Sequence, residues 1–308
     1  AGNIDVVLGK LVYTHMLNSR GGIETDITVN RLAENRYLII SSATVHPRDK
    51  AWIERQITNS DNVTLTDMTS GYAVLSLQGP RSRDILSQVT DADLSNDAFP
   101  FSTSQEIDVG FARIIANRLT YVGELGWELH IPTEFAQGVF DVVMAAGADF
   151  DLWPAGYHAL EHLRSERAYR EYELDLTPED TPLEAGLGFT VKLDKPNGFT
   201  GRDALMRQKE AGPLTKRLVM FKLRDPKPVL FHEELIRRND EIVGYISSGA
   251  YGFTLGTSVG MGYVHHPNGI TKDLVESSDW EIEIAGERHP ADASLRAFFD
   301  PTGERAKG

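Results

Sequence analysis

The chain contains no cysteine among its 308 residues. This absence excludes a disulfide framework, a thiolate nucleophile and a metal site built on thiolates. It is compatible with a reducing compartment, and we expect the cytoplasm or, in a eukaryote, the mitochondrial matrix. Long hydrophobic runs are also lacking, because no stretch reaches the roughly 18 apolar residues of a membrane-spanning helix. No secretory signal opens the sequence, and we expect no membrane partner.

Positive charge is scarce. The chain has 31 lysines and arginines against 45 aspartates and glutamates, which gives a formal net charge of −14. An acidic chain repels the phosphate backbone of nucleic acids, and the sequence shows no basic stripe, so we expect no nucleic-acid partner. A small anionic ligand is not excluded, because one local cation is enough to hold it.

The signatures of nucleotide-binding loops are missing as well. The sequence has no G-x-x-x-x-G-K-[ST] segment. Gly260-Met261-Gly262 begins like a dinucleotide-binding loop, but strand residues follow it where a helix is required. We therefore expect FAD only if another domain or another chain supplies it.

The chain otherwise has an ordinary globular composition, 41% hydrophobic and 25% charged. An apolar strand at Tyr72–Leu77 precedes a predicted helix at Arg81–Val89. A second strand at Trp127–Ile131 precedes a helix at Phe135–Ala146, with Thr133 as its N-cap. Such strand–helix pairs, mixed with hairpins, predict an α+β fold with split βαβ units.

The pattern of predicted secondary structure changes near Lys216. Short β-rich runs follow, with turn signals at Asn268-Gly269 and Ala285-Gly286. They predict a small antiparallel β-barrel at the C-terminus, and we place the domain boundary between residues 1–212 and 213–308. Before this boundary, Tyr157–Tyr172 is predicted to be one continuous helix.

One short segment matches a motif that is known from zinc sites. His158-Ala159-Leu160-Glu161-His162 matches H-x-x-E-H, whose spacing places both imidazoles on one face of a helix, as a zinc site requires. The motif is short, and a third ligand has to come from elsewhere in the chain. Two histidines on a packed or solvated helix give the same pattern. We favour that interpretation and assign no residue to a metal.

Two interpretations of the segment Tyr121–Glu128 stay open on spacing alone. Two glycines bracket two acids there, and the segment runs into an aromatic strand. One interpretation is a β-turn with exposed acids. The other is a ring-binding floor, in which Tyr121 and Trp127 offer flat faces. Glu128 then accepts the ring N–H and exocyclic amine of a pterin or guanine. Taken alone, Asp26 is better explained as a solvated acid at a strand end.

Seven segments, taken in this order, resemble the glycine-cleavage T-protein (aminomethyltransferase) family. The resemblance runs from about Lys10 to Phe299-Asp300-Pro301. Seven motifs in the right order are far more specific than any one of them. The segments are Tyr13–Asn18, Gly21–Asp26, Leu77–Pro80, Tyr121–Glu128, Leu163–Glu166, Thr181–Leu187 and Phe199–Leu205.

The resemblance implies an enzyme with a three-part, clover-like arrangement and tetrahydrofolate in the middle. The family's catalytic aspartate follows Gly-Gly-Ile, and this position is Asp26 here. Its implied role is to activate the folate nitrogen that attacks an iminium carbon, either as a general base or as a fixed negative charge. Glu128 matches the acid that pairs with the pterin edge.

The resemblance implies further folate-binding residues. Tyr13 and Tyr121 match aromatic residues that line the folate, and Arg164 matches a basic residue of the supporting helix. Thr28 is included because the strand period points it the same way as Asp26. Ser41 is included because it stands where the family commonly has asparagine.

Three features resemble the dimethylglycine and sarcosine dehydrogenase branch of the family, namely Gly156–Leu160, the opening Val12–Asn18 and the tail Pro301–Arg305. In that branch an N-terminal flavin domain oxidises an N-methyl amine to an iminium. Free-standing members carry Gly-x-Arg-Asp where this chain has His158–Glu161, and about 70 further residues before this point. We therefore expect the folate-binding part of such a dehydrogenase, with the N-terminal part of the family fold missing. A flavin dehydrogenase domain is its expected partner, and the iminium is its expected substrate.

Two alternatives stay open. A related non-catalytic phosphatase regulator shares much of the pattern but lacks the acid at the position of Glu128. Asp26 and Glu128 are both present here, which favours a working folate site. The less favoured alternative is a zinc hydrolase that uses His158, Glu161 and His162.

Overall fold

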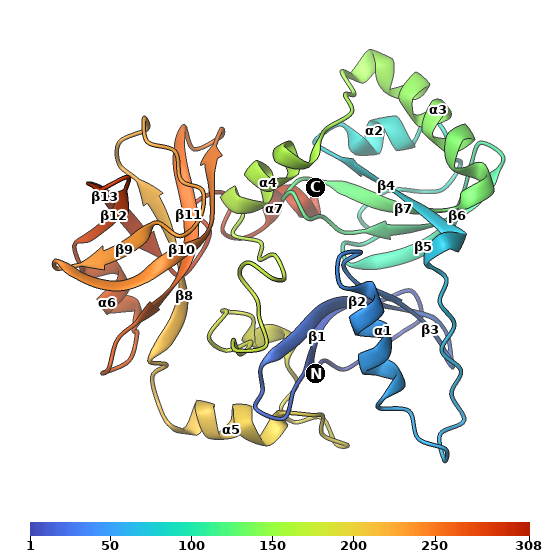
Figure 1. Ribbon diagram of the computed structural model, residues 1–308. Coiled ribbons are helices and arrows are strands. Elements are labelled where there is room, and N and C mark those ends of the chain that lie inside the picture. Colours follow the sequence, from blue (N-terminus) through green and yellow to red (C-terminus); the bar gives the residue numbers. More distant parts are fainter. The chain divides into compact units, whose positions relative to one another are not determined.

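The computed structural model describes residues 1–308, which form two compact units (Figure 1). The sheet unit consists of residues 4–13, 27–154 and 303–308. The barrel unit consists of residues 1–3, 14–26 and 155–302. Each unit is therefore assembled from segments that are far apart in the sequence.

A four-stranded antiparallel sheet is the centre of the sheet unit, with strand order β4-β7-β6-β5. Helices α2 and α3 pack against each other and against β7. Their apolar side chains and one face of the sheet form a continuous hydrophobic core. The elements are β4 (Tyr72–Gln78), α2 (Ser82–Leu86), β5 (Thr103–Val109), β6 (Ala112–Arg118), β7 (Gly126–Pro132), α3 (Ala136–Gly147) and α7 (Glu304–Lys307).

Three further strands, in the order β1-β2-β3, form a second sheet. Strands β1 and β2 each contribute residues to both units, because the division falls within them. The elements of this region are β1 (Leu11–Leu17), β2 (Ile23–Ala33), β3 (Arg36–Ile40) and α1 (His46–Glu54).

The barrel unit contains a closed barrel of six strands in the order β10-β11-β8-β13-β12-β9, with every pair antiparallel where its register is defined. Its interior is filled by aliphatic and aromatic side chains, and helix α4 packs against β10 and β11. The elements are α4 (Tyr157–Glu166), α5 (Arg202–Glu210), β8 (Lys216–Leu223), β9 (Leu235–Arg238), β10 (Glu241–Gly252), β11 (Thr257–His265), α6 (Lys272–Ser277), β12 (Trp280–Ile284) and β13 (Glu287–Ser294).

Short 3-10 helices complete the chain at Thr69–Gly71, Thr133–Phe135, Ala148–Phe150 and Gly188–Thr190. No helix of the chain is long and apolar enough to cross a membrane. The expected α+β class and the C-terminal antiparallel barrel are both confirmed. The boundary between residues 212 and 213 stays a prediction.

Two local expectations were wrong. The helix expected over Tyr157–Tyr172 ends at Glu166, and Ala168 adopts a left-handed backbone with φ of 53° that breaks the helical path. Thr133 does not cap α3, because a 3-10 turn precedes that helix. The Thr133 hydroxyl instead donates to the carbonyl of Ser70.

Phe221 tests the barrel core. Its side chain is fully buried and makes an edge-on contact with Trp280, with ring centroids 5.4 Å apart. We expect Phe221→Ala to lower the free energy of unfolding by about 3–5 kcal/mol, because it removes a large buried ring and leaves a cavity. The control is Phe231→Ala, whose side chain is 65% exposed and whose loss should change stability by about 0.5 kcal/mol or less. Equal effects of the two substitutions in denaturant unfolding would contradict this core assignment.

Candidate functional site

Strand β7 presents two different faces. Trp127, Leu129 and Ile131 point into the core of the sheet unit and are fully buried. Glu128 and His130 occupy the opposite face, because successive side chains of a strand alternate. The strand period thus separates an apolar face from a polar one.

Trp127 cannot be part of the ring-binding floor that one of the two open interpretations assigned to Tyr121 and Trp127. Its indole is 0% exposed. It contacts the edge of Phe99, and the Arg118 guanidinium lies over its ring. The period of β7 places position 127 inward whenever position 128 faces outward, so that interpretation was wrong for this residue.

Glu128 has an unusual environment for a carboxylate in a sheet. It lies opposite Ser76 on β4 and Asn117 on β6. Its side chain is 22% exposed, and its Oε2 lies 3.7 Å from Nε2 of His130. Neither carboxylate oxygen accepts a hydrogen bond from the protein, so both are available to donors of a ligand.

The loop before β7 is a compact turn. The Thr120 hydroxyl accepts hydrogen bonds from the backbone N–H groups of Val122 and Gly123, at 3.1 and 3.0 Å. Glu124 forms an ion pair with Arg305 at 2.9 Å. Of the two acids in this segment, Glu124 therefore has a structural partner, whereas Glu128 has no hydrogen-bond donor. Tyr121 lies in the same loop and is partly exposed.

Behind Glu128 lies a buried polar network that the sequence alone did not indicate. Asn117 Nδ2 lies 3.0 Å from His130 Nε2. Asn30 on β2 donates to the Ser104 hydroxyl at 2.7 Å and to Asn117 Oδ1 at 3.5 Å. Of this network, only His130 could have been placed from the sequence. It stands two residues after Glu128, so the alternation of a strand puts both side chains on the same face.

The other expected folate-binding residues of the sheet unit lie on the three-stranded sheet. Tyr13 on β1 is exposed, and Thr28 occupies one of the partly exposed positions of β2. Ser41 directly follows β3 and is also partly exposed. All three are accessible, and their contact with a folate stays a prediction.

Asp26 belongs to the barrel unit and lies at a partly exposed position of β2. The hairpin before it requires glycine. Asn18 Oδ1 accepts hydrogen bonds from the backbone N–H groups of Arg20 and Gly22, both at 3.0 Å. A Cβ atom on Gly22 would lie 1.9 Å from the carbonyl oxygen of Pro178, so no other residue fits there. The Gly-Gly motif thereby fixes the start of the strand that carries Asp26.

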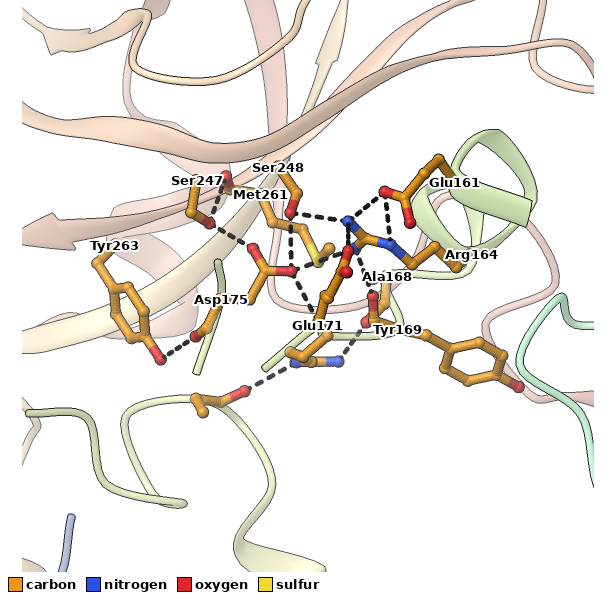
Figure 2. Close-up of polar contacts among 12 residues, drawn as sticks. Glu161, Arg164, Ala168, Tyr169, Glu171, Asp175, Ser247, Ser248, Met261 and Tyr263 are labelled. Carbon is orange, nitrogen blue, oxygen red and sulfur yellow. Dashed lines mark hydrogen bonds and ion pairs between the residues drawn. The ribbon is translucent and has the colours of Figure 1, made fainter. Parts of the chain in front are cut away.

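Arg164, the remaining expected site residue, is buried in an ionic cluster of the barrel unit (Figure 2). Its guanidinium lies 2.6 Å from Glu161, 2.8 Å from Glu171 and 3.2 Å from Asp175. It also donates to the carbonyl of Tyr169. The guanidinium therefore has abundant acceptors within the unit, and its contact with a folate stays a prediction.

Asp175 connects this cluster to the barrel. Its carboxylate accepts hydrogen bonds from the hydroxyls of Ser247 and Ser248 on β10. At the outer edge of the cluster, burial raises the pKa of Glu171. Burial also acts to raise the pKa of Glu161, but the hydrogen bonds and the charge of Arg164 outweigh it and lower that pKa.

The segments that resemble metal and flavin motifs have structural partners within the barrel unit. Glu161 of the H-x-x-E-H segment faces Arg164, and His162 Nδ1 bonds to the carbonyl of Tyr251. No group of three or more potential ligands is arranged to hold a metal ion. The Gly260–Gly262 segment lies inside β11, where a Cβ atom on Gly262 would lie 2.2 Å from the carbonyl oxygen of Tyr245. Close strand packing accounts for this glycine, so this segment does not fit a flavin nucleotide.

Comparison with known proteins identifies two matching family models. The GCVT N-terminal domain matches residues 1–195, and the glycine cleavage T-protein C-terminal barrel domain matches residues 216–300. The chain is 42% identical to the mitochondrial sarcosine dehydrogenase of Homo sapiens over 97% of the chain and 34% of that protein. It is 38% identical to the mitochondrial pyruvate dehydrogenase phosphatase regulatory subunit of Mus musculus, over 95% of the chain and 35% of that protein. It thus spans about a third of the length of these two relatives.

A solved structure shows the same fold. The glycine cleavage system aminomethyltransferase T from Bartonella henselae superposes with a TM-score of 0.79 at 25% sequence identity. The match covers 93% of this chain and 75% of that one.

Arg164 provides a test of the ionic cluster. We expect Arg164→Ala to lower the free energy of unfolding by about 3–5 kcal/mol, because Asp175 and its neighbours are left buried without their counter-ion. The control is Arg20→Ala, which removes an exposed ion pair with Glu179 and should cost less than about 1 kcal/mol. Urea unfolding of both variants measures the difference. A loss at Arg164 no larger than that at Arg20 would show that the cluster does not stabilise the unit.

Proposed function

Because the chain belongs to the glycine cleavage T-protein family, we propose that it binds tetrahydrofolate and transfers a one-carbon unit to it. The observation that carries this proposal is the Glu128 carboxylate, which is partly buried and accepts no hydrogen bond from the protein. A carboxylate in such a position is suited to two adjacent N–H donors of a bound ring. The pterin edge of a folate presents that pair of donors.

The proposed role of Asp26 is chemical. Tetrahydrofolate, when bound, supplies the two nitrogens that take up the one-carbon unit. Transfer from a methylene iminium cation forms two new carbon–nitrogen bonds and breaks both bonds of the carbon–nitrogen double bond to the departing amine. The N–H bonds of the two accepting nitrogens also break, so that one proton goes to the amine and one is left in excess. We assign to Asp26 the stabilisation of positive charge and the acceptance of that proton. Its partly exposed position on β2 supports this role.

The proposed one-carbon donor is the iminium of an N-methyl amine such as sarcosine or dimethylglycine. Similarity to the human sarcosine dehydrogenase supports this choice. The oxidation that produces the iminium is assigned to a flavin domain outside the 308 residues, because no dinucleotide-binding loop is found in them. The proposed location is the cytoplasm or, in a eukaryote, the mitochondrial matrix.

A regulatory protein without this chemistry is the second candidate. Similarity to the mouse phosphatase regulatory subunit supports it, since that relative matches nearly the whole chain. A regulator has no need of a carboxylate that the protein itself leaves without a hydrogen bond. Measured turnover with formaldehyde and tetrahydrofolate, above the uncatalysed background, would exclude this candidate.

Glu128 gives the first test of the proposed function. We expect the parent chain to bind tetrahydrofolate in a calorimetric titration. Glu128→Ala should weaken binding by about 2–3 kcal/mol, because a charge-assisted pair of hydrogen bonds is lost. The matched control is Glu124→Ala, which removes the other acid of the same segment, the partner of Arg305, and should leave the affinity unchanged. An unchanged affinity of Glu128→Ala would refute the assignment to the pterin edge.

Asp26 gives the second test. We expect Asp26→Ala to retain tetrahydrofolate but to slow transfer by about 10²–10⁴-fold, the usual contribution of a positioned acid–base group. Glu24→Ala serves as the control, because Glu24 is the preceding partly exposed acid on β2. The rate of methylenetetrahydrofolate formation is the measurement. If Asp26→Ala turned over like the parent, Asp26 would not be the acid–base group.

A further inference from the structure

The face of the sheet that carries Glu128 holds a line of polar side chains within the sheet unit. Glu128 and Asn117 are paired across β7 and β6, and His130 is the next residue on the same face of β7. His130 is only 4% exposed, and Asn117 is fully buried. Buried polar groups of this kind are destabilising unless they are hydrogen-bonded, and His130 and Asn117 meet this condition through each other.

His130 is held in place from behind. Its Nε2 lies 3.0 Å from the Asn117 amide, and Asn117 in turn accepts from Asn30, which also donates to Ser104. Side chains from several strands, joined by hydrogen bonds, thus fix the imidazole. The same Nε2 atom is 3.7 Å from Glu128 Oε2.

Glu128 lacks any such support of its own. A glutamate side chain has several rotatable bonds, and fixing one in a single geometry opposes binding by a substantial loss of entropy. The imidazole edge restricts the positions open to the carboxylate. Because Asn117 Oδ1 accepts from Asn30, the Asn117 amide turns its N–H groups toward His130, and Nε2 is the acceptor. The lone pair of Nε2 repels Oε2 and so excludes the carboxylate from the space beside the ring.

We propose that His130 is a positioning residue for Glu128, with Asn117 and Asn30 as the support that fixes the imidazole. This inference rests on the proposed function, in which Glu128 accepts from the N–H donors of a folate ring. His130 presets the carboxylate, so that less freedom is lost when the ligand binds. The oxygens of Glu128 stay open to the ligand because His130 stands beside the carboxylate without forming a hydrogen bond to it.

The test is a double-mutant cycle on tetrahydrofolate affinity. Calorimetry measures the dissociation constant of the parent, His130→Phe, Glu128→Ala and the double variant. Phenylalanine keeps a ring at position 130 and removes its nitrogens. We expect His130→Phe to weaken binding about tenfold in the parent and to have no effect when Glu128 is already alanine, because contacting residues are coupled. If His130→Phe does not fold, His130→Ala takes its place in the cycle.

A second variant separates positioning from simple structural support. Glutamine carries both a donor and an acceptor, so His130→Gln should restore most of the affinity that His130→Phe loses. In His130→Phe the tetrahydrofolate concentration that half-saturates transfer should rise by a larger factor than the rate at saturation falls, because the residue acts on binding.

Each result decides the inference. An unchanged affinity of His130→Phe, or an equal loss with and without Glu128, would overturn it while leaving the proposed function in place. Failure of the parent itself to bind tetrahydrofolate would overturn the proposed function, and the inference with it. A loss that disappears in the Glu128→Ala background, together with recovery in His130→Gln, would establish His130 as the positioning residue.

Discussion

The alternation of side chains along β7 is the constraint on which the candidate site depends. Burial of Trp127, Leu129 and Ile131 in the core of the sheet unit fixes the register of the strand. A shift by one residue would bring Glu128 into the apolar core and expose the large indole. Burial of apolar side chains on one face of β7 thereby keeps Glu128 on the opposite face, although no hydrogen bond from the protein reaches its carboxylate.

The barrel unit contains a buried positive charge, which carboxylates from three positions of the chain neutralise. Arg164 lies on α4 with 1% of its side chain exposed, and it is surrounded by three carboxylates and a carbonyl. The chain turns back after Glu166 so that Glu171 and Asp175 reach the guanidinium. Asp175 then carries the same network to Ser247 and Ser248 on the barrel strand β10 (Figure 2).

The period and turn signals of the sequence were sufficient for the α+β class, the C-terminal barrel and the strands β4 and β7. They missed β5 and β6, because β6 buries Asn117 and Arg118, polar residues whose partners are remote in sequence. Arg118 donates to the carbonyl of Phe99 and to the amide oxygen of Asn96, and no local sequence pattern predicts such contacts. The motif around Glu128 was recognisable, whereas the support behind it depends on Asn30, which only the folded chain brings near.

The carboxylates of the chain differ in the ion-pair and hydrogen-bond partners that the protein provides for them. Glu124 has Arg305, Glu161 has Arg164, and Asp175 has an arginine and two hydroxyls. Each of these carboxylates has an arginine partner within its own unit. Glu128 is partly buried like them, yet it receives no hydrogen bond, and the nearest polar group is an imidazole that other residues hold in place. The Glu128 carboxylate is 22% exposed and keeps acceptor sites that the protein does not fill. An acid with open acceptor sites beside an imidazole that other residues hold is therefore the feature on which the proposed folate site rests.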